Sequence, residues 1–89
     1  MIYEIDIPHL GANIDDGRVS AWAKNVGDFV ETLDVLCSYE TTKATFEIEA
    51  ERAGYLLEIL HADEVVPVLT VIGYLGDRPD EKVSDRHDA

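Results

Sequence analysis

An alternating run near the middle of the chain limits what this sequence can fold into. Over residues 44–50 the two faces differ: Ala44, Phe46, Ile48 and Ala50 on one side, and Thr45, Glu47 and Glu49 on the other. A period of two residues is that of a β-strand with one buried face. The preceding residues 35–39 are also apolar, and the short polar segment 40–43 separates the two runs. We therefore predict a β-hairpin with Lys43 at or next to its tip.

The turn of this hairpin lacks the strongest turn signals. It contains neither Asn-Gly nor Asp-Gly, so a type I turn, which tolerates most residues, fits it better than a tight primed turn. Lys43 is the only cation between Lys24 and Arg52. From spacing alone, a lone lysine in a turn is usually a solvated surface residue. An amine held on a turn is also well placed for another protein to reach.

The rest of the chain consists of short strand-like segments separated by turn residues. Besides the hairpin, strand patterns cover residues 1–8, 18–23, 29–30, 55–60, 65–66 and 69–75. No segment has the 3.6-residue period of an amphipathic helix. Seven or eight short strands joined by brief turns predict an all-β sandwich or flattened barrel. Trp22, in the second strand, is expected to be a packed aromatic.

A weak internal repeat divides the chain into two halves. Residues 27–36 align with residues 63–72 at an offset of 36, and residues 16–19 align with residues 53–56 at an offset of 37. Two repeats are too few for a solenoid. They fit two similar half-domains that wrap one core with approximate two-fold symmetry. In that arrangement the Thr42–Lys43 turn and the two termini lie at opposite ends.

The composition argues against several functional classes. A net charge of −12 disfavours nucleic acid, because phosphate binding needs clustered Lys and Arg, and it keeps the chain off anionic membranes. The same charge fits a partner with a basic docking face. The single cysteine, Cys37, allows no internal disulfide and is expected to be a buried hydrophobe. The three histidines lack metal-ligand spacing, and no catalytic set can be drawn, so we expect neither a metal nor an active site.

The chain divides into a predicted folded part, residues 1–76, and a charged tail, residues 77–89. The tail has one large apolar residue and buries too little surface to order itself, so we expect a flexible segment or the start of a linker. The first residues lack the basic segment that opens a signal peptide. The longest apolar run, residues 65–75, is interrupted by proline and glycine and is too short to cross a bilayer.

The hairpin sequence E-T-T-K-A-T-F-E-I-E-A, followed by Ala53-Gly54, resembles the attachment hairpin of lipoyl domains, which are carrier modules of 2-oxo acid dehydrogenase complexes. The resemblance covers residues 1 to about 76. It implies a flattened β-barrel of two four-stranded antiparallel sheets in which Lys43 carries lipoate in amide linkage. It further implies that the attaching enzyme recognises the residues around the lysine, namely Glu40, Thr41, Thr42 and Ala44. Three glycines, Gly17, Gly27 and Gly54, are expected to be structural.

Three positions depart from the family pattern. Thr42 stands where Asp is usual, the loop at residues 61–64 is one residue shorter, and Leu69 stands where Gly is common. Biotinyl carrier domains share the resemblance, but they usually have Met on both sides of the lysine, which favours lipoate here over biotin. A third alternative is an unmodified binding module that retains the fold.

The resemblance implies a carrier without catalytic activity of its own. Its lipoyl-lysine would shuttle acyl groups between active sites of a 2-oxo acid dehydrogenase-type complex, as part of a dihydrolipoamide acyltransferase-type component. The expected partners are a lipoyl-attaching ligase or transferase, the 2-oxo acid dehydrogenase, the acyltransferase core and dihydrolipoamide dehydrogenase. The domain itself is expected to be monomeric, in the cytoplasm of a bacterium or in the mitochondrial matrix of a eukaryote.

Overall fold

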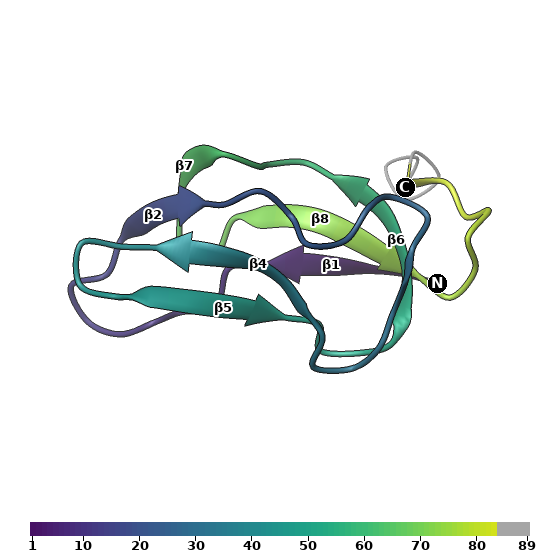
Figure 1. The fold of residues 1–89 in the computed structure, drawn as a ribbon, viewed down its shortest axis with the longest axis horizontal. Coiled ribbons are helices and arrows are strands. Elements are labelled where there is room, and N and C mark those ends of the chain that lie inside the picture. The colour runs from purple at the N-terminus through teal and green to yellow at the C-terminus, as the bar shows by residue number, and fades with distance from the viewer. Residues whose placement is uncertain (84–89) are drawn as a thin grey trace.

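The structure is a computed structural model that describes residues 1–83 (Figure 1). These residues form eight strands and no α-helix: β1 (Ile2–Asp6), β2 (Asp16–Val19), β3 (Phe29–Val30), β4 (Val35–Glu40), β5 (Thr45–Glu49), β6 (Gly54–Ile59), β7 (Glu64–Pro67) and β8 (Val71–Gly76). The alternating run of the sequence forms β5, and the apolar run before it forms β4. The all-β prediction and the central hairpin are confirmed.

Two antiparallel four-stranded sheets stack into a flattened barrel. One sheet has the strand order β1-β8-β6-β3, and the other has the order β5-β4-β2-β7. The molecule measures 38 × 27 × 20 Å along its principal axes. Exchanging β1 with β5, β8 with β4, β6 with β2 and β3 with β7 converts one strand order into the other. The topology therefore confirms the two-fold relation between half-domains that the repeat predicts.

The core lies between the two sheets and is apolar throughout. Its most deeply buried side chains come from both halves of the chain: Ile7, Val19, Val30, Leu36, Tyr39, Leu56, Ile72 and Leu75. Burying one aliphatic side chain of this size stabilises a fold by about 1.5–3 kcal/mol. No charged or strongly polar residue is buried among residues 1–83. The acidic side chains of the described chain therefore all lie at its surface.

The second strand differs from its predicted bounds. The pattern predicts a strand over residues 18–23, whereas β2 begins earlier and ends at Val19. Beyond that point the chain stays beside β4 through hydrogen bonds from Ser20 N to Ser38 O (2.9 Å) and from Ala23 N to Leu36 O (2.7 Å). These bonds are too widely spaced to form a regular ladder. The segment is thus attached to the sheet without being a strand.

Trp22 lies in this irregular segment and is half-buried against the core. Its indole Nε1 donates a hydrogen bond to the His61 carbonyl at 2.9 Å, which ties the segment to the loop after β6. The Trp22 ring packs against the core, and its only hydrogen-bond donor has a partner, as is usual for a packed tryptophan. The expectation of a packed aromatic is confirmed.

The last predicted strand, residues 69–75, begins two residues late because the backbone of Leu69 is left-handed. Its φ is +70°, and β8 starts at Val71. Leu33, 36 residues earlier, has a φ of +74°, and Gly27 and Asp63 form a second pair at +98° and +55°. The same unusual backbone conformations thus recur at the offset of the sequence repeat.

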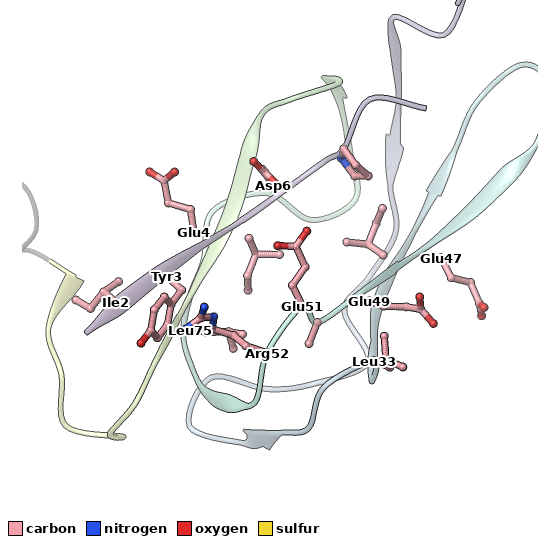
Figure 2. A pocket seen from close by; sticks show the side chains of 14 residues that line it. Ile2, Tyr3, Glu4, Asp6, Leu33, Glu47, Glu49, Glu51, Arg52 and Leu75 are labelled. Carbon is pink, nitrogen blue, oxygen red and sulfur yellow. The ribbon is translucent and has the colours of Figure 1, made fainter. Parts of the chain in front are cut away.

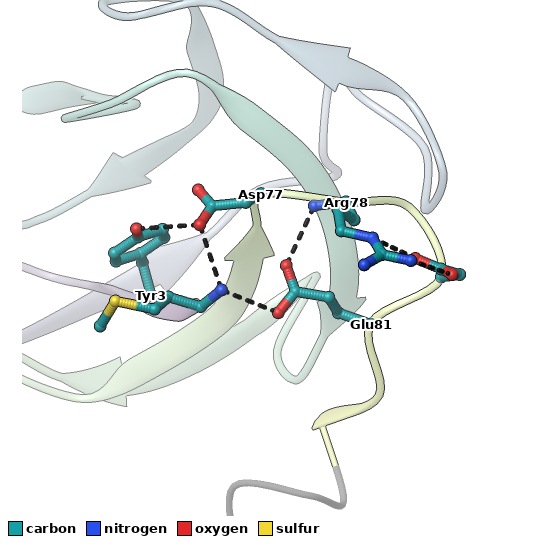
Figure 3. A network of polar contacts seen from close by, with 6 residues as sticks. Tyr3, Asp77, Arg78 and Glu81 are labelled. Carbon is teal, nitrogen blue, oxygen red and sulfur yellow. Dashed lines mark hydrogen bonds and ion pairs between the residues drawn. The ribbon is translucent and has the colours of Figure 1, made fainter.

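Met1 and the residues after β8 lie at the end of the barrel opposite the β4–β5 turn (Figure 1). The Met1 amine contacts the carboxylates of Asp77 and Glu81 at 3.1 and 3.0 Å (Figure 3). Hydrogen bonds to Glu81 and Asp77 raise the pKa of the amine, and the same bonds lower the pKa of each carboxyl. The start of the predicted tail therefore contacts the barrel, whereas residues 84–89 lie outside the described residues. The domain boundary at residue 76 stays a prediction.

Candidate functional site

Lys43 lies on the turn that joins β4 to β5, at one end of the long axis of the barrel (Figure 1). Glu40 and Thr45 form the last residue pair of the β4–β5 ladder. Residues 41–44 extend beyond that pair and close the hairpin. Lys43 is therefore outside both strands, where neither sheet covers it.

The hydroxyl of Thr41 organises the turn. Its Oγ1 accepts hydrogen bonds from the backbone N–H groups of Lys43 (3.2 Å) and Ala44 (3.1 Å), and it donates to the Ala44 carbonyl at 2.9 Å. The Thr41 N–H donates to the same carbonyl at 2.9 Å. Side-chain oxygens of Ser and Thr can replace backbone partners in turns in this manner. One hydroxyl thus supplies the turn chemistry that the sequence otherwise lacks.

The other predicted recognition residues are open to solvent. Glu40, Thr42, Lys43 and Ala44 are exposed, whereas Thr41 is half-buried. The alternation predicts Ala44 on the buried face, and this is wrong because Ala44 belongs to the turn, beyond the sheet. Within residues 1–83 the Lys43 ammonium forms no ion pair. Its amine is accessible and has no carboxylate to displace.

Gly17 and Tyr39 hold the base of the hairpin. The buried Tyr39 ring extends from β4 across β2, and its hydroxyl donates to the Val66 carbonyl of β7 at 2.6 Å. Gly17 lies under this ring, and a Cβ there would be 2.7 Å from Glu40 O and 2.8 Å from the ring. Burial, with a smaller contribution from the charge of Asp16, raises the pKa of the Tyr39 hydroxyl. Three strands are thereby locked together beneath the turn.

The other two glycines that the sequence singles out lie away from Lys43. Gly54 on β6 is the counterpart of Gly17, because a Cβ there would be 2.8 Å from the Gly76 carbonyl of β8. Gly27 has no atom within 4 Å of a built Cβ, but its φ of +98° is one that side chains disfavour. Two of the three positions thus require a close backbone approach, and the third requires a left-handed backbone.

The described residues offer few other reactive or metal-binding side chains. Cys37 is buried on β4, and burial raises the pKa of its thiol to about 11. His61 contacts Glu64 at the surface. Across residues 1–83 no group of three or more His, Cys, Asp or Glu side chains is arranged to hold a metal ion. No helix in the same residues is long and apolar enough to cross a bilayer.

Sequence reasoning missed two of these features. It did not anticipate that the Thr41 hydroxyl holds the turn together, and the role of Thr41 in recognition by the attaching enzyme stays a prediction. It also gave no role to Tyr39, which was one apolar residue of a strand. A threonine that opens a four-residue turn is a recognisable local signal, but the Tyr39 bond joins residues 27 positions apart and has no local signature.

These features define a class of protein, namely a flattened β-barrel of two four-stranded sheets that displays a lysine on a hairpin turn. The chain belongs to the biotin and lipoyl attachment family. The Biotin_lipoyl family model, described as biotin-requiring enzyme, matches residues 3–75. The resemblance noted from the hairpin sequence is therefore confirmed.

Its relatives include components of multienzyme complexes. The chain is 37% identical over 78 residues to the dihydrolipoyllysine-residue acetyltransferase component of the pyruvate dehydrogenase complex of Corynebacterium glutamicum. It is 36% identical over 75 residues to the dihydrolipoyllysine-residue succinyltransferase component of the 2-oxoglutarate dehydrogenase complex of Bacillus subtilis. The matches cover 86% and 83% of this chain but only 12% and 18% of those proteins. The chain therefore spans less than a fifth of their length.

Two solved structures share the fold. The lipoyl domain of the 2-oxoglutarate dehydrogenase complex from Azotobacter vinelandii is 31% identical with a TM-score of 0.63, and the match covers 81% of this chain and 95% of that domain. The urea carboxylase of Kluyveromyces lactis gives a TM-score of 0.72 at 21% identity, covering 85% of this chain and 6% of that one. At that identity the second match supports the fold alone.

Proposed function

We propose that this chain is a lipoyl carrier domain and that Lys43 is its attachment residue. The observation that carries the proposal is an exposed lysine, free of ion pairs within residues 1–83, on a turn beyond the ladder. The relatives described above are named for a dihydrolipoyllysine residue, which favours lipoate as the attached group. The carried acyl group would move between active sites of a 2-oxo acid dehydrogenase-type complex.

The residues around Lys43 fit such a group. Attachment forms an amide bond between Nζ, after it loses a proton, and the carboxyl carbon of an activated lipoate, whose activating group departs. The product is neutral, and no described carboxylate loses a partner, because Lys43 is unpaired. When bound, the group supplies a dithiolane for acyl transfer and electron transfer. The protein contributes position, through Thr41 in the turn and Tyr39 beneath it.

A biotin carrier is the alternative within the family. The lysine is flanked by Thr42 and Ala44 rather than by the paired methionines usual in biotinyl domains. These neighbours, together with the names of the relatives, support lipoate. An unmodified binding module is the third candidate, and Thr42 in place of the usual Asp is the feature that favours it.

The proposal extends to partners and location. The attaching ligase would read Glu40, Thr41, Thr42 and Ala44 around the lysine, and all of these except the half-buried Thr41 are exposed. The dehydrogenase, acyltransferase and dihydrolipoamide dehydrogenase sites would then be visited in turn, since a tether raises the local concentration of the carrier at each. A net charge of −12 opposes self-association, so the domain would be monomeric. We propose the bacterial cytoplasm, or the mitochondrial matrix in a eukaryote.

Intact mass after attachment in vitro tests the proposal. The chain is incubated with a lipoate-attaching enzyme and, separately, with a biotin-attaching enzyme, each with its activated donor. Two variants are compared, Lys43→Arg and the control Lys24→Arg, in which arginine retains the ion pair to Asp34 (3.6 Å). We expect one lipoyl adduct on the natural chain and on Lys24→Arg, and none on Lys43→Arg. A biotinyl adduct alone would establish the biotin carrier, and a bare chain in both reactions would leave the binding module.

A further inference from the structure

Strand β5 is the outer strand of its sheet and has a groove beside it. It pairs with β4 on one side and with no other described strand, and β1 is likewise the outer strand of the other sheet. A groove of about 580 Å³ separates β1 from β5 and residues 50–52 (Figure 2). The long side of the barrel next to the hairpin is therefore open.

The free edge of β5 presents a defined set of backbone groups. The hydrogen bonds from Thr41 N to Ala44 O (2.9 Å) and from Ala50 N to Asp34 O (2.9 Å) place the even-numbered residues against β4. In an antiparallel pair the intervening residues direct their N–H and C=O groups away from the partner strand. The backbone of Thr45, Glu47 and Glu49 thus faces outward, in the geometry that accepts another strand.

The side chains along this edge are acidic on one face and apolar on the other. Glu47 and Glu49 are exposed on the outer side of β5, and Glu51 points into the space between β5 and β1 (Figure 2). Ile48, buried between them, faces the core. The one basic side chain of the groove, Arg52, lies 3.7 Å above the Tyr3 ring. The edge is therefore strongly negative.

We propose that the free edge of β5 binds an extended, basic segment of a partner protein, which joins the sheet as an additional strand. Alternate residues of a strand lie about 6.6–6.8 Å apart on one face. Lys or Arg at alternate positions would then face Glu47 and Glu49 as cross-strand pairs, each worth roughly 0.2–1 kcal/mol. The intervening residues would be apolar and face the groove. Main-chain hydrogen bonds would supply affinity, and the alternation would supply specificity.

Other occupants fit this edge less well. A second copy of the chain would place its own Glu47 and Glu49 near the same carboxylates, and like charges opposite each other destabilise a strand pair. Acidic residues on an outer strand also protect it against self-pairing. Both arguments disfavour an acidic strand beside β5 and favour a basic one. The proposal goes beyond the carrier function and does not depend on acylation of Lys43.

An NMR titration tests the proposal on the unmodified 89-residue chain. Three capped heptapeptides of equal net charge are used. The first alternates Lys and Val, the second is the same peptide N-methylated at alternate residues, and the third has its lysines contiguous. We expect amide shifts concentrated over residues 45–51 with the alternating peptide. Affinity should fall at least tenfold on N-methylation, because backbone bonds are lost while charge is kept. The contiguous peptide should bind several-fold more weakly than the alternating one.

Matched variants separate the edge from general electrostatics. The double variant Glu47→Lys with Glu49→Lys should bind the alternating Lys-Val peptide at least tenfold more weakly than the natural chain does. The control Asp15→Lys with Glu31→Lys makes the same change in net charge at exposed residues outside the groove, and it should lose about twofold at most. The dispersion of the amide spectrum reports whether the charge-reversed variant is folded. If it is not, the neutral double variant Glu47→Gln with Glu49→Gln tests the same edge and should also bind the peptide more weakly than the natural chain. Equal binding of the N-methylated peptide, shifts spread over the whole acidic surface, or dimerisation through β5 would each overturn the proposal.

Discussion

The two ends of the barrel occupy equivalent places in the two-fold arrangement, and each presents an amine. At one end β4 and β5 are joined by a turn that carries Lys43. At the other end β8 and β1 are not joined, and Met1 stands where the turn would be (Figures 1 and 3). The Lys43 ammonium has no ion pair in the described chain, whereas the Met1 amine contacts two carboxylates.

The difference shows how the same architecture leaves one amine without an ion pair in the described residues and holds the other amine in ion pairs. The turn around Lys43 is held by a neutral hydroxyl, so its amine is left available. The opposite end is held by charge, because the Met1 amine contacts the carboxylates of Asp77 and Glu81, and these hydrogen bonds raise the pKa of the amine. Position on a continuous turn, rather than the mere presence of an amine, therefore distinguishes the two ends.

Moving the lysine by one residue along the turn should have the largest effect on attachment. The double change Thr42→Lys with Lys43→Thr keeps composition and charge but shifts the amine along the turn. A misplacement of about 1 Å can cost on the order of 100-fold in rate, so we expect lipoate attachment to fall at least that far. Time-resolved intact mass with the attaching enzyme gives the rate. Attachment at the natural rate would show that the attaching enzyme ignores position.

Alanine at the two equivalent glycines should destabilise the hairpin end more than the terminal end. At Gly17 the new methyl meets both a carbonyl and the Tyr39 ring, whereas at Gly54 it meets the Gly76 carbonyl at 2.8 Å and Leu75 only at 3.6 Å. Overpacking costs about 1–3 kcal/mol, and we place Gly17→Ala at the upper end of that range. Urea denaturation measures both variants. A larger loss for Gly54→Ala would contradict the ring contact.

Removing the Thr41 hydroxyl should loosen the turn without unfolding the barrel. Thr41→Val keeps the shape but leaves the Lys43 and Ala44 amides without their acceptor. We expect faster hydrogen exchange at those two amides and attachment slowed by about threefold to tenfold, equivalent to about 1 kcal/mol. Thr41→Ser retains the hydroxyl and serves as the control. If Ser fails to restore both readouts, the methyl group rather than the hydroxyl is responsible.

The left-handed leucines offer a small gain in stability. Leu33 and Leu69 are both exposed, and a bulky side chain is disfavoured at their φ values. Asn tolerates this conformation better, so we expect Leu33→Asn and Leu69→Asn each to raise the free energy of unfolding by about 0.5 kcal/mol. Alanine at the same positions keeps the Cβ and therefore the backbone strain, so Leu33→Ala and Leu69→Ala should change the free energy of unfolding little. Thermal unfolding of all four variants would reveal a hidden packing role if the Asn variants were less stable.

The ion pairs at Met1 should give the smallest effect, and it should depend on pH. The pKa of the amine is raised above its ordinary value of 8.0, so the stabilisation it contributes is full below pH 8 and is lost as the pH rises through the raised pKa. The carboxyl pKa values are lowered from 3.8 and 4.5, so their contribution is full above about pH 4.5 and is lost below. Acetylating Met1 should therefore lower the melting temperature at pH 6 and lower it less at pH 11. An equal shift at both pH values would contradict the ion-pair account.

The sequence predicted those features whose causes are local. Alternation located β5, the apolar run located β4, and the repeat predicted the two-fold relation of the sheets. The predicted end of β2 was wrong because Ser20 is hydrogen-bonded to β4 without continuing the strand. The predicted start of β8 was wrong because Leu69, an apolar residue in an apolar run, has a left-handed backbone. Leu33 shows the same bend, and the repeat could have revealed it. The Tyr39 bond and the groove beside β5 depend on strand order, which one sequence does not display.

The burial of Cys37 has a consequence for the reactivity of its thiol. With a pKa of about 11 and 3% of its surface exposed, the thiol is thiolate in only about one molecule in a few thousand at pH 7.5. Disulfide exchange and thioester capture both require an accessible thiolate. A thiol-specific reagent added to the unmodified chain should therefore label Cys37 only in molecules that have unfolded, so the extent of labelling reports unfolding.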